Sequence, residues 1–358
     1  MPDARVQAAT DNWASRLIAN GVDFNDFTRI TRSLERWDDW LDAWRATADG
    51  HRERGRRARE DGHGVTAGEA FLQAAVCYHF AKFVWVLDAE RNRECTRLAI
   101  DSLAAAHEFL DPTFERIEAP FDGSRLAGNL RRPDRVERPP LVVLIPGLDS
   151  TKEEFFNLET VFLKRGMATL SMDGPGQGES GFELHIRPDY EAAVAAMLDA
   201  MVDRDDVDLE RIGAAGVSMG GYYAPRAAAF EPRIRAVVGI SGPYDMSSNW
   251  DNLPSLTRET LRHHTGASSD EEARAKAAEL NLAGVAERIT QPALIMTGKL
   301  DRLIPWEDTK RIADEAPGAE WVLYEDGTHV VNNRPFLHRP LIGDWMAEKL
   351  ATADRLVA

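Results

Sequence analysis

One serine of the chain lies in a setting that suits a nucleophile. The segment Gly216-Val217-Ser218-Met219-Gly220 follows a buried apolar run and precedes the helix-forming stretch Tyr222–Phe230. Between a strand and a helix, the two glycines allow a tight turn that lifts the serine hydroxyl above the sheet. A glycine-rich turn with an inert serine is the alternative. The placement favours Ser218 as a nucleophile and the backbone N–H of Met219 as a donor to a developing oxyanion.

A base and an acid follow in the chain. A serine hydroxyl is a weak nucleophile at neutral pH, so it needs a base to take its proton and a carboxylate to orient that base. Asp301 follows the apolar run Ala293–Thr297, and His329 follows the run Trp321–Tyr324. Both therefore fall on loops at the carboxyl ends of expected strands. In one known fold, the nucleophile lies on a turn between a strand and a helix, and its triad residues follow one another in the same chain order: serine, aspartate, histidine. We predict a catalytic triad of Ser218, His329 and Asp301.

The second oxyanion donor is expected on the loop after the apolar run Leu141–Ile145. There Pro146-Gly147-Leu148 lets the chain turn back towards the serine, and we assign the donor to the N–H of Leu148. Asp149 comes next, which is unexpected because an ionised carboxylate would repel the developing negative charge. Two interpretations stay open: Asp149 caps a helix that starts near Lys152, or it is protonated and acts as an auxiliary acid.

Aromatic side chains near the expected mouth of this site would suit a flat ligand. The candidates for substrate binding are Phe155, Tyr244, Trp250 and Trp306, although each is equally suited to a hydrophobic core. The expected partner is a small molecule, with an aromatic group favoured.

The elements that must position these residues alternate after about residue 114. Apolar runs typical of fully buried strands recur, mostly separated by helix-forming segments. They are Leu141–Ile145, Ala168–Met172, Ile212–Val217, Ala236–Ile240, Ala293–Thr297 and Trp321–Tyr324, after two short strands between Phe114 and Arg131. This alternation predicts an α/β fold, with a mostly parallel sheet flanked by helices, over residues 114–358. The polar, helix-forming stretch at about 244–289 is interpreted as a lid insertion.

Residues 1–113 have a different pattern of apolar and polar residues. They lack an alternating strand pattern and carry apolar residues at helical spacing, as at Trp40 and Trp44. Thr66 and Glu69 form a capping signature, which predicts that a helix begins there. We predict an N-terminal all-helical cap domain over residues 1–113. Its five tryptophans are interpreted as packing between helices, with a wall facing the substrate as the alternative.

Composition limits the classes of function. The 358 residues are 44% hydrophobic, and the two cysteines, Cys77 and Cys95, exclude a disulfide scaffold. The net charge is −16, of which residues 111–358 carry −13, so nucleic acid and anionic membrane are poor partners. The arginine run at residues 52–59 is interleaved with acidic residues and is interpreted as a solvated helix end. The chain shows no signal-peptide pattern and no apolar run of about 18 residues, so we expect a cytoplasmic protein.

With these motifs in place, the chain resembles the α/β-hydrolase superfamily. Asp173–Gly178, with the sequence DGPGQG, is similar to a loop of that superfamily. Pro146–Glu154, together with the helical domain and the insertion, looks like the carbon–carbon bond hydrolases that include 2,6-dihydroxypseudooxynicotine hydrolase. Fermentation/respiration switch-type and polyketide-shortening hydrolases are more distant members. The resemblance implies the same triad, a homodimer, no metal and no cofactor. It also implies a glutamate at the position of Asp149, where this chain has a carboxylate one methylene shorter.

We therefore expect a serine hydrolase that cleaves a carbon–carbon bond next to a ketone, in an acyl-arene or β-dicarbonyl substrate, through an acyl-enzyme. Carbon leaves less readily than alkoxide, so an acid must protonate it; we assign this to His329, with help from Asp149 if that residue is protonated. A carboxylesterase or lactonase on the same triad is the first alternative, and it needs no acid at Asp149. A non-catalytic binding protein of the same fold is the second.

Overall fold

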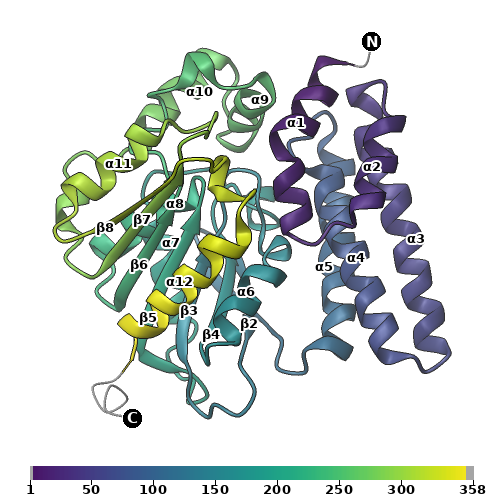
Figure 1. Ribbon diagram of the computed structural model, residues 1–358, viewed down its shortest axis with the longest axis horizontal. Coiled ribbons are helices and arrows are strands. Elements are labelled where there is room, and N and C mark those ends of the chain that lie inside the picture. Colours follow the sequence, from purple (N-terminus) through teal and green to yellow (C-terminus); the bar gives the residue numbers. More distant parts are fainter. Residues whose placement is uncertain (1–2, 352–358) are drawn as a thin grey trace. The chain divides into compact units, whose positions relative to one another are not determined.

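The structure, a computed structural model, describes residues 3–351 in two compact units (Figure 1). The helical unit takes in the chain up to Phe114 together with Glu153–Asn157 and Pro254–Thr260. The sheet unit comprises Glu115–Lys152, Leu158–Leu253 and the chain from Leu261 onward. The expected cap domain, residues 1–113, thus lies within a unit that also includes two later segments, and the expected lid insertion is divided between the units.

The helical unit is built from five α-helices of the N-terminal region. They are α1 (Ala4–Ala19), α2 (Phe24–Ser33), α3 (Trp40–Glu60), α4 (Gly64–Lys82) and α5 (Ala89–Leu110). Aspartate side chains accept hydrogen bonds from the first N–H groups of three of them, α1, α2 and α5. All five tryptophans are buried, and the ring of Trp40 lies 5.1 Å from that of Trp37 and 5.7 Å from that of Trp44. The packing interpretation of these tryptophans is therefore confirmed.

The predicted start of a helix at Thr66 is wrong by one turn. Helix α4 begins at Gly64 with His63 in the N-cap position, so Thr66 lies inside its first turn. The cause is the end of α3, where Gly62 adopts a φ of +77° and the N–H of His63 donates to the carbonyl of Ala58 at 2.8 Å. Because this tight turn leads directly into the next helix, the capping signature is not used.

The sheet unit contains one eight-stranded sheet in the order β1-β2-β4-β3-β5-β6-β7-β8. The strands are β1 (Glu115–Phe121), β2 (Ser124–Arg131), β3 (Pro140–Ile145), β4 (Ala168–Asp173), β5 (Asp208–Val217), β6 (Ile234–Ile240), β7 (Ala293–Gly298) and β8 (Glu320–Tyr324). Strand β2 runs antiparallel to its two neighbours, and the other neighbouring pairs are parallel. Every apolar run that predicted a strand forms one, and the mostly parallel α/β sheet is confirmed.

Helices cover both faces of this sheet. In Figure 1, α6 (Phe156–Leu163) and α12 (Pro335–Lys349) cross in front of the strands, and α7 (Glu191–Asp199) and α8 (Gly220–Phe230) lie behind them. Helix α11 (Trp306–Glu315) joins β7 to β8. Between β6 and β7, the chain forms α9 (Ser255–His264) and α10 (Asp270–Glu279) and adds no strand to the sheet.

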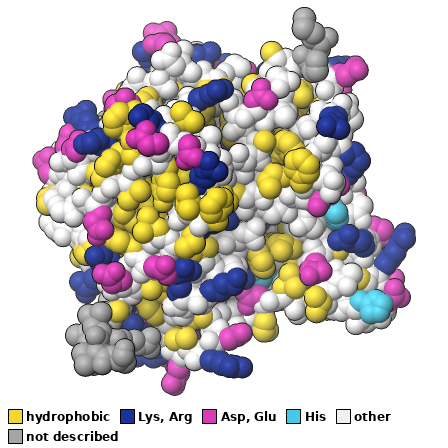
Figure 2. All heavy atoms as spheres, viewed as in Figure 1, with side chains coloured by type: hydrophobic (Ala, Val, Ile, Leu, Met, Phe, Trp, Pro, Cys, Tyr) yellow, Lys and Arg dark blue, Asp and Glu magenta, His cyan; other side chains and the backbone are white. Residues whose placement is uncertain are grey.

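Charges of both signs share the surface. Figure 2 shows Lys and Arg side chains interspersed with Asp and Glu side chains over the visible face. Many charged side chains of the described residues form ion pairs, as between Arg204 and Glu115 at 2.8 Å and between Arg226 and Glu191 at 2.6 Å. The net charge of −16 therefore does not form a field of one sign on this face. Among the described residues, no helix is both long enough and apolar enough to cross a membrane.

Candidate active site

Ser218 lies at a sharp turn between β5 and α8 and has a φ of +57°, which is unusual for a residue with a side chain. The two flanking positions leave no room for a side chain, so both must be glycine. A Cβ on Gly216 would lie 1.8 Å from the carbonyl oxygen of Gly220, and a Cβ on Gly220 would lie 2.1 Å from that of Ile145. The strand and the helix can approach this closely only with glycine at both positions, and the serine is held at the apex of the turn.

The three residues predicted as a triad are hydrogen bonded in series. His329 Nε2 lies 2.9 Å from Ser218 Oγ, and His329 Nδ1 lies 2.7 Å from Asp301 Oδ2. The other carboxylate oxygen of Asp301 accepts hydrogen bonds from the N–H groups of Leu303 and Ile304, at 2.9 and 3.0 Å. The Asp301 side chain is fully buried. Because β5, β7 and β8 are parallel, their carboxyl ends bring these three loops to one edge of the sheet.

The loop that carries His329 is held by two buried hydroxyl groups that the sequence did not indicate. Ser241, directly after β6, accepts a hydrogen bond from the N–H of Val330 at 3.0 Å and contacts the hydroxyl of Thr297 in β7 at 2.7 Å. Val330 and Val331 have φ angles of +57° and +54°, which are costly for β-branched residues. The hydroxyl pair thus stabilises a strained turn beside the base. Polar residues at the carboxyl ends of two buried strands were the available signal.

The expected oxyanion loop lies against the serine. A Cβ on Gly147 would lie 2.9 Å from Ser218 Cβ and 3.3 Å from Ser218 Oγ. In the part of the chain that the structure describes, neither the N–H of Leu148 nor that of Met219 donates a hydrogen bond, although both residues are buried. Buried N–H groups usually have partners, so two uncommitted donors close to a serine fit an oxyanion hole.

The far end of this loop is fixed by a buried lysine. Lys152 Nζ lies 2.9 Å from Asp173 Oδ2 and 2.7 Å from Glu179 Oε1, and the backbone N–H of Lys152 donates to Asp173 Oδ1 at 2.9 Å. Burial raises the pKa of Glu179, but hydrogen bonds from Arg116 and Lys152 outweigh it and lower this pKa to about 2. The helix expected near Lys152 is a single 3-10 turn, Lys152–Glu154, and α6 begins at Phe156. Asp149 is half-buried between the two ends of the loop.

The loop after β4 supports the oxyanion loop. Its Gln177 is buried, and the side-chain amide of Gln177 contacts the carbonyl groups of Pro146 and Gly147. In the sequence, DGPGQG stands out only through its resemblance to a superfamily loop, which gives no role to the glutamine. The contact depends on which carbonyl groups of another loop lie within reach, which the sequence alone does not indicate.

The four aromatic candidates belong to different parts of the fold. Phe155 is buried within the helical unit. Tyr244 and Trp250 belong to the hydrophobic core of the sheet unit, and the hydroxyl of Tyr244 donates to Glu315 at 2.6 Å while the guanidinium of Arg311 lies 3.8 Å from its ring. Trp306 is half-buried at the start of α11. Tyr244 therefore has a structural role in holding α11.

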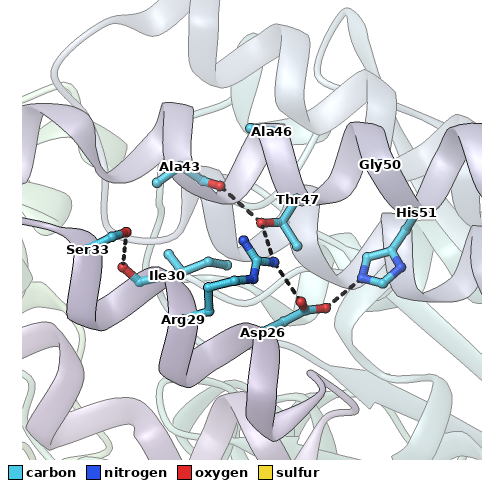
Figure 3. Close-up of a pocket in the computed structure, with 9 residues that line it drawn as sticks. All are labelled: Asp26, Arg29, Ile30, Ser33, Ala43, Ala46, Thr47, Gly50 and His51. Carbon is cyan, nitrogen blue, oxygen red and sulfur yellow. Dashed lines mark hydrogen bonds and ion pairs between the residues drawn. The ribbon is translucent and has the colours of Figure 1, made fainter.

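A groove of about 560 Å³ between α2 and α3 is separate from these residues (Figure 3). Asp26 lines the groove and contacts His51 Nε2 and the guanidinium of Arg29, each at 2.7 Å. Arg29 also donates to Thr47 Oγ1 at 3.3 Å. The polar side chains of this groove are hydrogen bonded to one another or to the backbone, and the arrangement is that of an interhelical polar contact.

The mostly parallel sheet, the strained serine between β5 and α8, and the histidine and aspartate at the same edge define an α/β hydrolase. The chain belongs to the family described as FrsA-like, Esterase FrsA-like, whose model matches residues 31–348. The resemblance to the superfamily is thereby confirmed, and the chain is a hydrolase.

Among individual proteins, the chain is similar to 2,6-dihydropseudooxynicotine hydrolase of Paenarthrobacter nicotinovorans. The two are 32% identical over 347 residues, which cover 96% of this chain and 93% of that protein. The crystal structure of the 2,6-dihydroxy-pseudo-oxynicotine hydrolase superposes with a TM-score of 0.87 and 32% identity over 95% of this chain and 96% of that one. The alpha/beta hydrolase ucsC of Acremonium sp is 33% identical over 254 residues, which are 63% of this chain and 51% of that protein.

Proposed function

We propose that this chain is a serine hydrolase that cleaves a carbon–carbon bond next to a ketone, in an acyl-arene or β-dicarbonyl compound, through an acyl-enzyme. The observation that carries the serine mechanism is the series of hydrogen bonds from Ser218 Oγ through His329 to Asp301, at 2.9 and 2.7 Å. The substrate class is supported by the similarity to a pseudooxynicotine hydrolase over 96% of the chain.

In the first half of the reaction, Ser218 Oγ attacks the ketone carbon while His329 Nε2 takes the hydroxyl proton. The carbonyl oxygen becomes an oxyanion, which accepts hydrogen bonds from the N–H groups of Leu148 and Met219. Each such donor contributes on the order of 3 kcal/mol to lowering the barrier. The buried carboxylate of Asp301 holds the imidazole with Nδ1 protonated and stabilises the imidazolium that forms.

The tetrahedral adduct then collapses, and the carbon–carbon bond breaks with its electron pair on the leaving carbon. An aromatic ring or a second carbonyl must delocalise that pair, and His329 returns its proton to the leaving carbon. The acyl group stays on Ser218. A water molecule, deprotonated by His329, releases it as a carboxylic acid. Asp149 assists protonation of the leaving carbon in this proposal, from its half-buried place one residue beyond Leu148.

A carboxylesterase or lactonase is the second candidate, favoured by the match to a family described as an esterase. The same triad and oxyanion donors serve it, because an alkoxide leaves readily. The two candidates differ in their need for an acid near the leaving group, so Asp149 separates them.

The deciding experiment measures turnover of acyl-phenol ketones, β-diketones, aryl esters and lactones by the wild-type chain and by three variants. Ser218→Ala should abolish turnover of every substrate. Asp149→Asn should slow ketone cleavage more than ester hydrolysis, whereas Asp205→Asn, at an exposed aspartate before β5, should change neither. Equal effects of Asp149→Asn on ketone and ester contradict the assisting acid, and turnover of esters alone makes the chain an esterase. If a fluorophosphonate fails to label Ser218 in the folded chain, the protein is a non-catalytic member of the family.

A further inference from the structure

We infer that Gln177 is a positioning residue for this reaction, which sets the direction of the oxyanion donor at Leu148. The inference rests on the proposed function, because it concerns the oxyanion hole of that site. Gln177 lies in the loop between β4 and α7 and is only 1% exposed. Among the described residues, its side chain is hydrogen bonded to Pro146 and Gly147 of the oxyanion loop, to Gly174 and to Tyr190, and not to the triad, so its effect passes through the backbone of the oxyanion loop.

The side-chain amide of Gln177 binds two consecutive carbonyl groups of that loop. Its Nε2 donates to the carbonyl oxygen of Pro146 at 2.7 Å and to that of Gly147 at 2.9 Å. An amide nitrogen has two hydrogens, and both are used here. The turn at Pro146–Gly147 is therefore held from the side of the β4 loop.

The second of these contacts fixes the oxyanion donor. The carbonyl of Gly147 and the N–H of Leu148 belong to the same peptide group, which is planar and trans, so the two point in opposite directions. A hydrogen bond that holds the carbonyl towards Gln177 consequently holds the N–H away from it. Gly147 itself lies against Ser218, as the 2.9 Å approach of its Cβ position to Ser218 Cβ shows. Without Gln177, this peptide is free to rotate and withdraw the donor.

The orientation of the Gln177 amide is itself determined. Its Oε1 accepts a hydrogen bond from the N–H of Gly174 at 2.9 Å and another from the hydroxyl of Tyr190 at 2.7 Å. A flipped amide would direct its NH₂ group at the N–H of Gly174 and its oxygen at two carbonyl groups, so three of the four bonds would be lost and only the one to the hydroxyl of Tyr190 could re-form. The ring of Tyr190 is fully buried and stacks on that of Tyr223 at 3.9 Å. This packing keeps the tyrosine hydroxyl in place.

The direct test compares Gln177→Leu with Gln291→Leu. Gln291 offers a matched control, since its amide also donates to two carbonyl groups, those of Ala228 and Ile234, just before the amino end of β7. Both variants lose the same kind of bonds, but only Gln177→Leu frees the oxyanion loop. With p-nitrophenyl acetate, kcat of Gln177→Leu should fall about 10- to 100-fold at nearly unchanged KM, because complete loss of an oxyanion donor costs about 10²- to 10³-fold. Gln291→Leu should keep the wild-type kcat.

If Gln177→Leu does not fold, a second pair of variants with smaller changes to the side chain tests the same inference. Tyr190→Phe removes only the hydroxyl that orients the Gln177 amide, and kcat should fall by a smaller factor. Tyr223→Phe is its control, because among the described residues the hydroxyl of Tyr223 has no hydrogen-bond partner. Each phenylalanine preserves the stacked rings.

A trifluoromethyl ketone inhibitor distinguishes positioning from general damage. It forms a tetrahedral adduct with a serine nucleophile, so its inhibition constant should rise in Gln177→Leu by the same factor by which kcat/KM falls. The inference is overturned if the wild type hydrolyses the ester and Gln177→Leu does so equally fast, or if the inhibitor binds both equally well. A wild type that neither hydrolyses the ester nor reacts with a fluorophosphonate overturns the proposed function, and the inference with it. An active esterase that leaves ketones intact removes only the proposed substrate class.

Discussion

Asp301 illustrates how much of the site depends on the fixed direction of single groups. One oxygen of its carboxylate faces His329 Nδ1, and the other accepts two backbone N–H groups of its own loop. The carboxylate cannot rotate without losing these bonds. Its negative charge and its position together favour the histidine tautomer that carries its proton on Nδ1, in which Nε2 can accept a hydrogen bond from the hydroxyl of Ser218.

Replacement of this carboxylate by an amide tests that assignment. In Asp301→Asn, the side chain keeps its shape, but its NH₂ group can face the histidine and favour the tautomer that carries its proton on Nε2. We expect kcat at neutral pH to fall about 10⁴-fold, with little change in the urea midpoint of unfolding. Asp205→Asn is the control for loss of one exposed carboxylate. A decrease in kcat of less than tenfold would show that Asp301 is not the orienting acid.

At the scale of elements, the carboxyl edge of the sheet gathers the loops that follow β3, β4, β5, β6, β7 and β8, and each carries one part of the candidate site. The loop after β8 is under strain, with positive φ angles at Val330 and Val331. Ser241, which has a φ of +49° itself, supplies the acceptor that satisfies the N–H of Val330. Positioning of the base is thus shared between three neighbouring loops.

Removal of the Ser241 hydroxyl should affect both stability and rate. In Ser241→Ala, the N–H of Val330 becomes a buried donor with no acceptor, which costs about 1–3 kcal/mol in the free energy of unfolding. The freed histidine loop should also lower kcat more than it changes KM. Ser102→Ala is a matched control in the helical unit, because within the described chain its buried hydroxyl makes no hydrogen bond, and that variant should be close to neutral in both measurements. Unchanged stability in Ser241→Ala would contradict the role of this hydroxyl.

Helix α12 carries a buried histidine that should make stability depend on pH. Burial, aided by the charge of Arg339, lowers the pKa of His338 from 6.5 to about 4. Between these two values, the unfolded chain binds a proton that the folded chain does not, so stability falls as the pH falls through this window. From pH 7 to pH 5, the contribution of His338 to this loss is about 2 kcal/mol. Urea unfolding at both pH values should show a smaller loss for His338→Asn, and an equal loss in both proteins would contradict the assignment.

The strands and the hydrogen-bonded arrangement of the three predicted triad residues could be predicted from the sequence because their signals are local. A continuous apolar run reports a buried strand, and Ser218, Asp301 and His329 each follow one such run. Gln177 and Ser241 escaped prediction because each contacts the backbone of a separate loop, and the local sequence does not indicate which backbone group lies within reach. The helix start at Thr66 was missed because Gly62 ends the preceding helix in a way that fixes the next start.

At the scale of the whole molecule, the helical unit is completed by residues far along the chain. Glu154 is fully buried there and forms a bidentate ion pair with the guanidinium of Arg16, in which both hydrogen bonds measure 2.7 Å. Glu154 Oε2 also lies 3.0 Å from His79 Nε2. Burial alone would raise the pKa of Glu154, but the guanidinium of Arg16 outweighs it and holds this pKa well below its usual range. Burial lowers the pKa of His79.

Neutralising this carboxylate should be costly. In Glu154→Gln, the buried guanidinium of Arg16 loses its counter-charge, and we expect the free energy of unfolding to fall by about 3–5 kcal/mol. Glu94→Gln breaks an exposed pair with Arg45 and should cost at most about 1 kcal/mol. Urea unfolding of both variants measures the difference. Similar losses in the two would show that Glu154 is not an essential part of the helical unit.

The division of the chain between its two units also sets the order in which the protein can be completed during synthesis. The chain passes between the units five times, and the helical unit receives its last segment only at Thr260. Ribosomes add about 5–20 residues per second, so roughly 7–30 s separate the emergence of Phe114 from that of Thr260. During this interval the five N-terminal helices lack Leu256, which belongs to their apolar core. Hydrophobic surface of the helical unit is therefore exposed until most of the sheet unit has been made, and assistance from a chaperone would be most valuable in that interval.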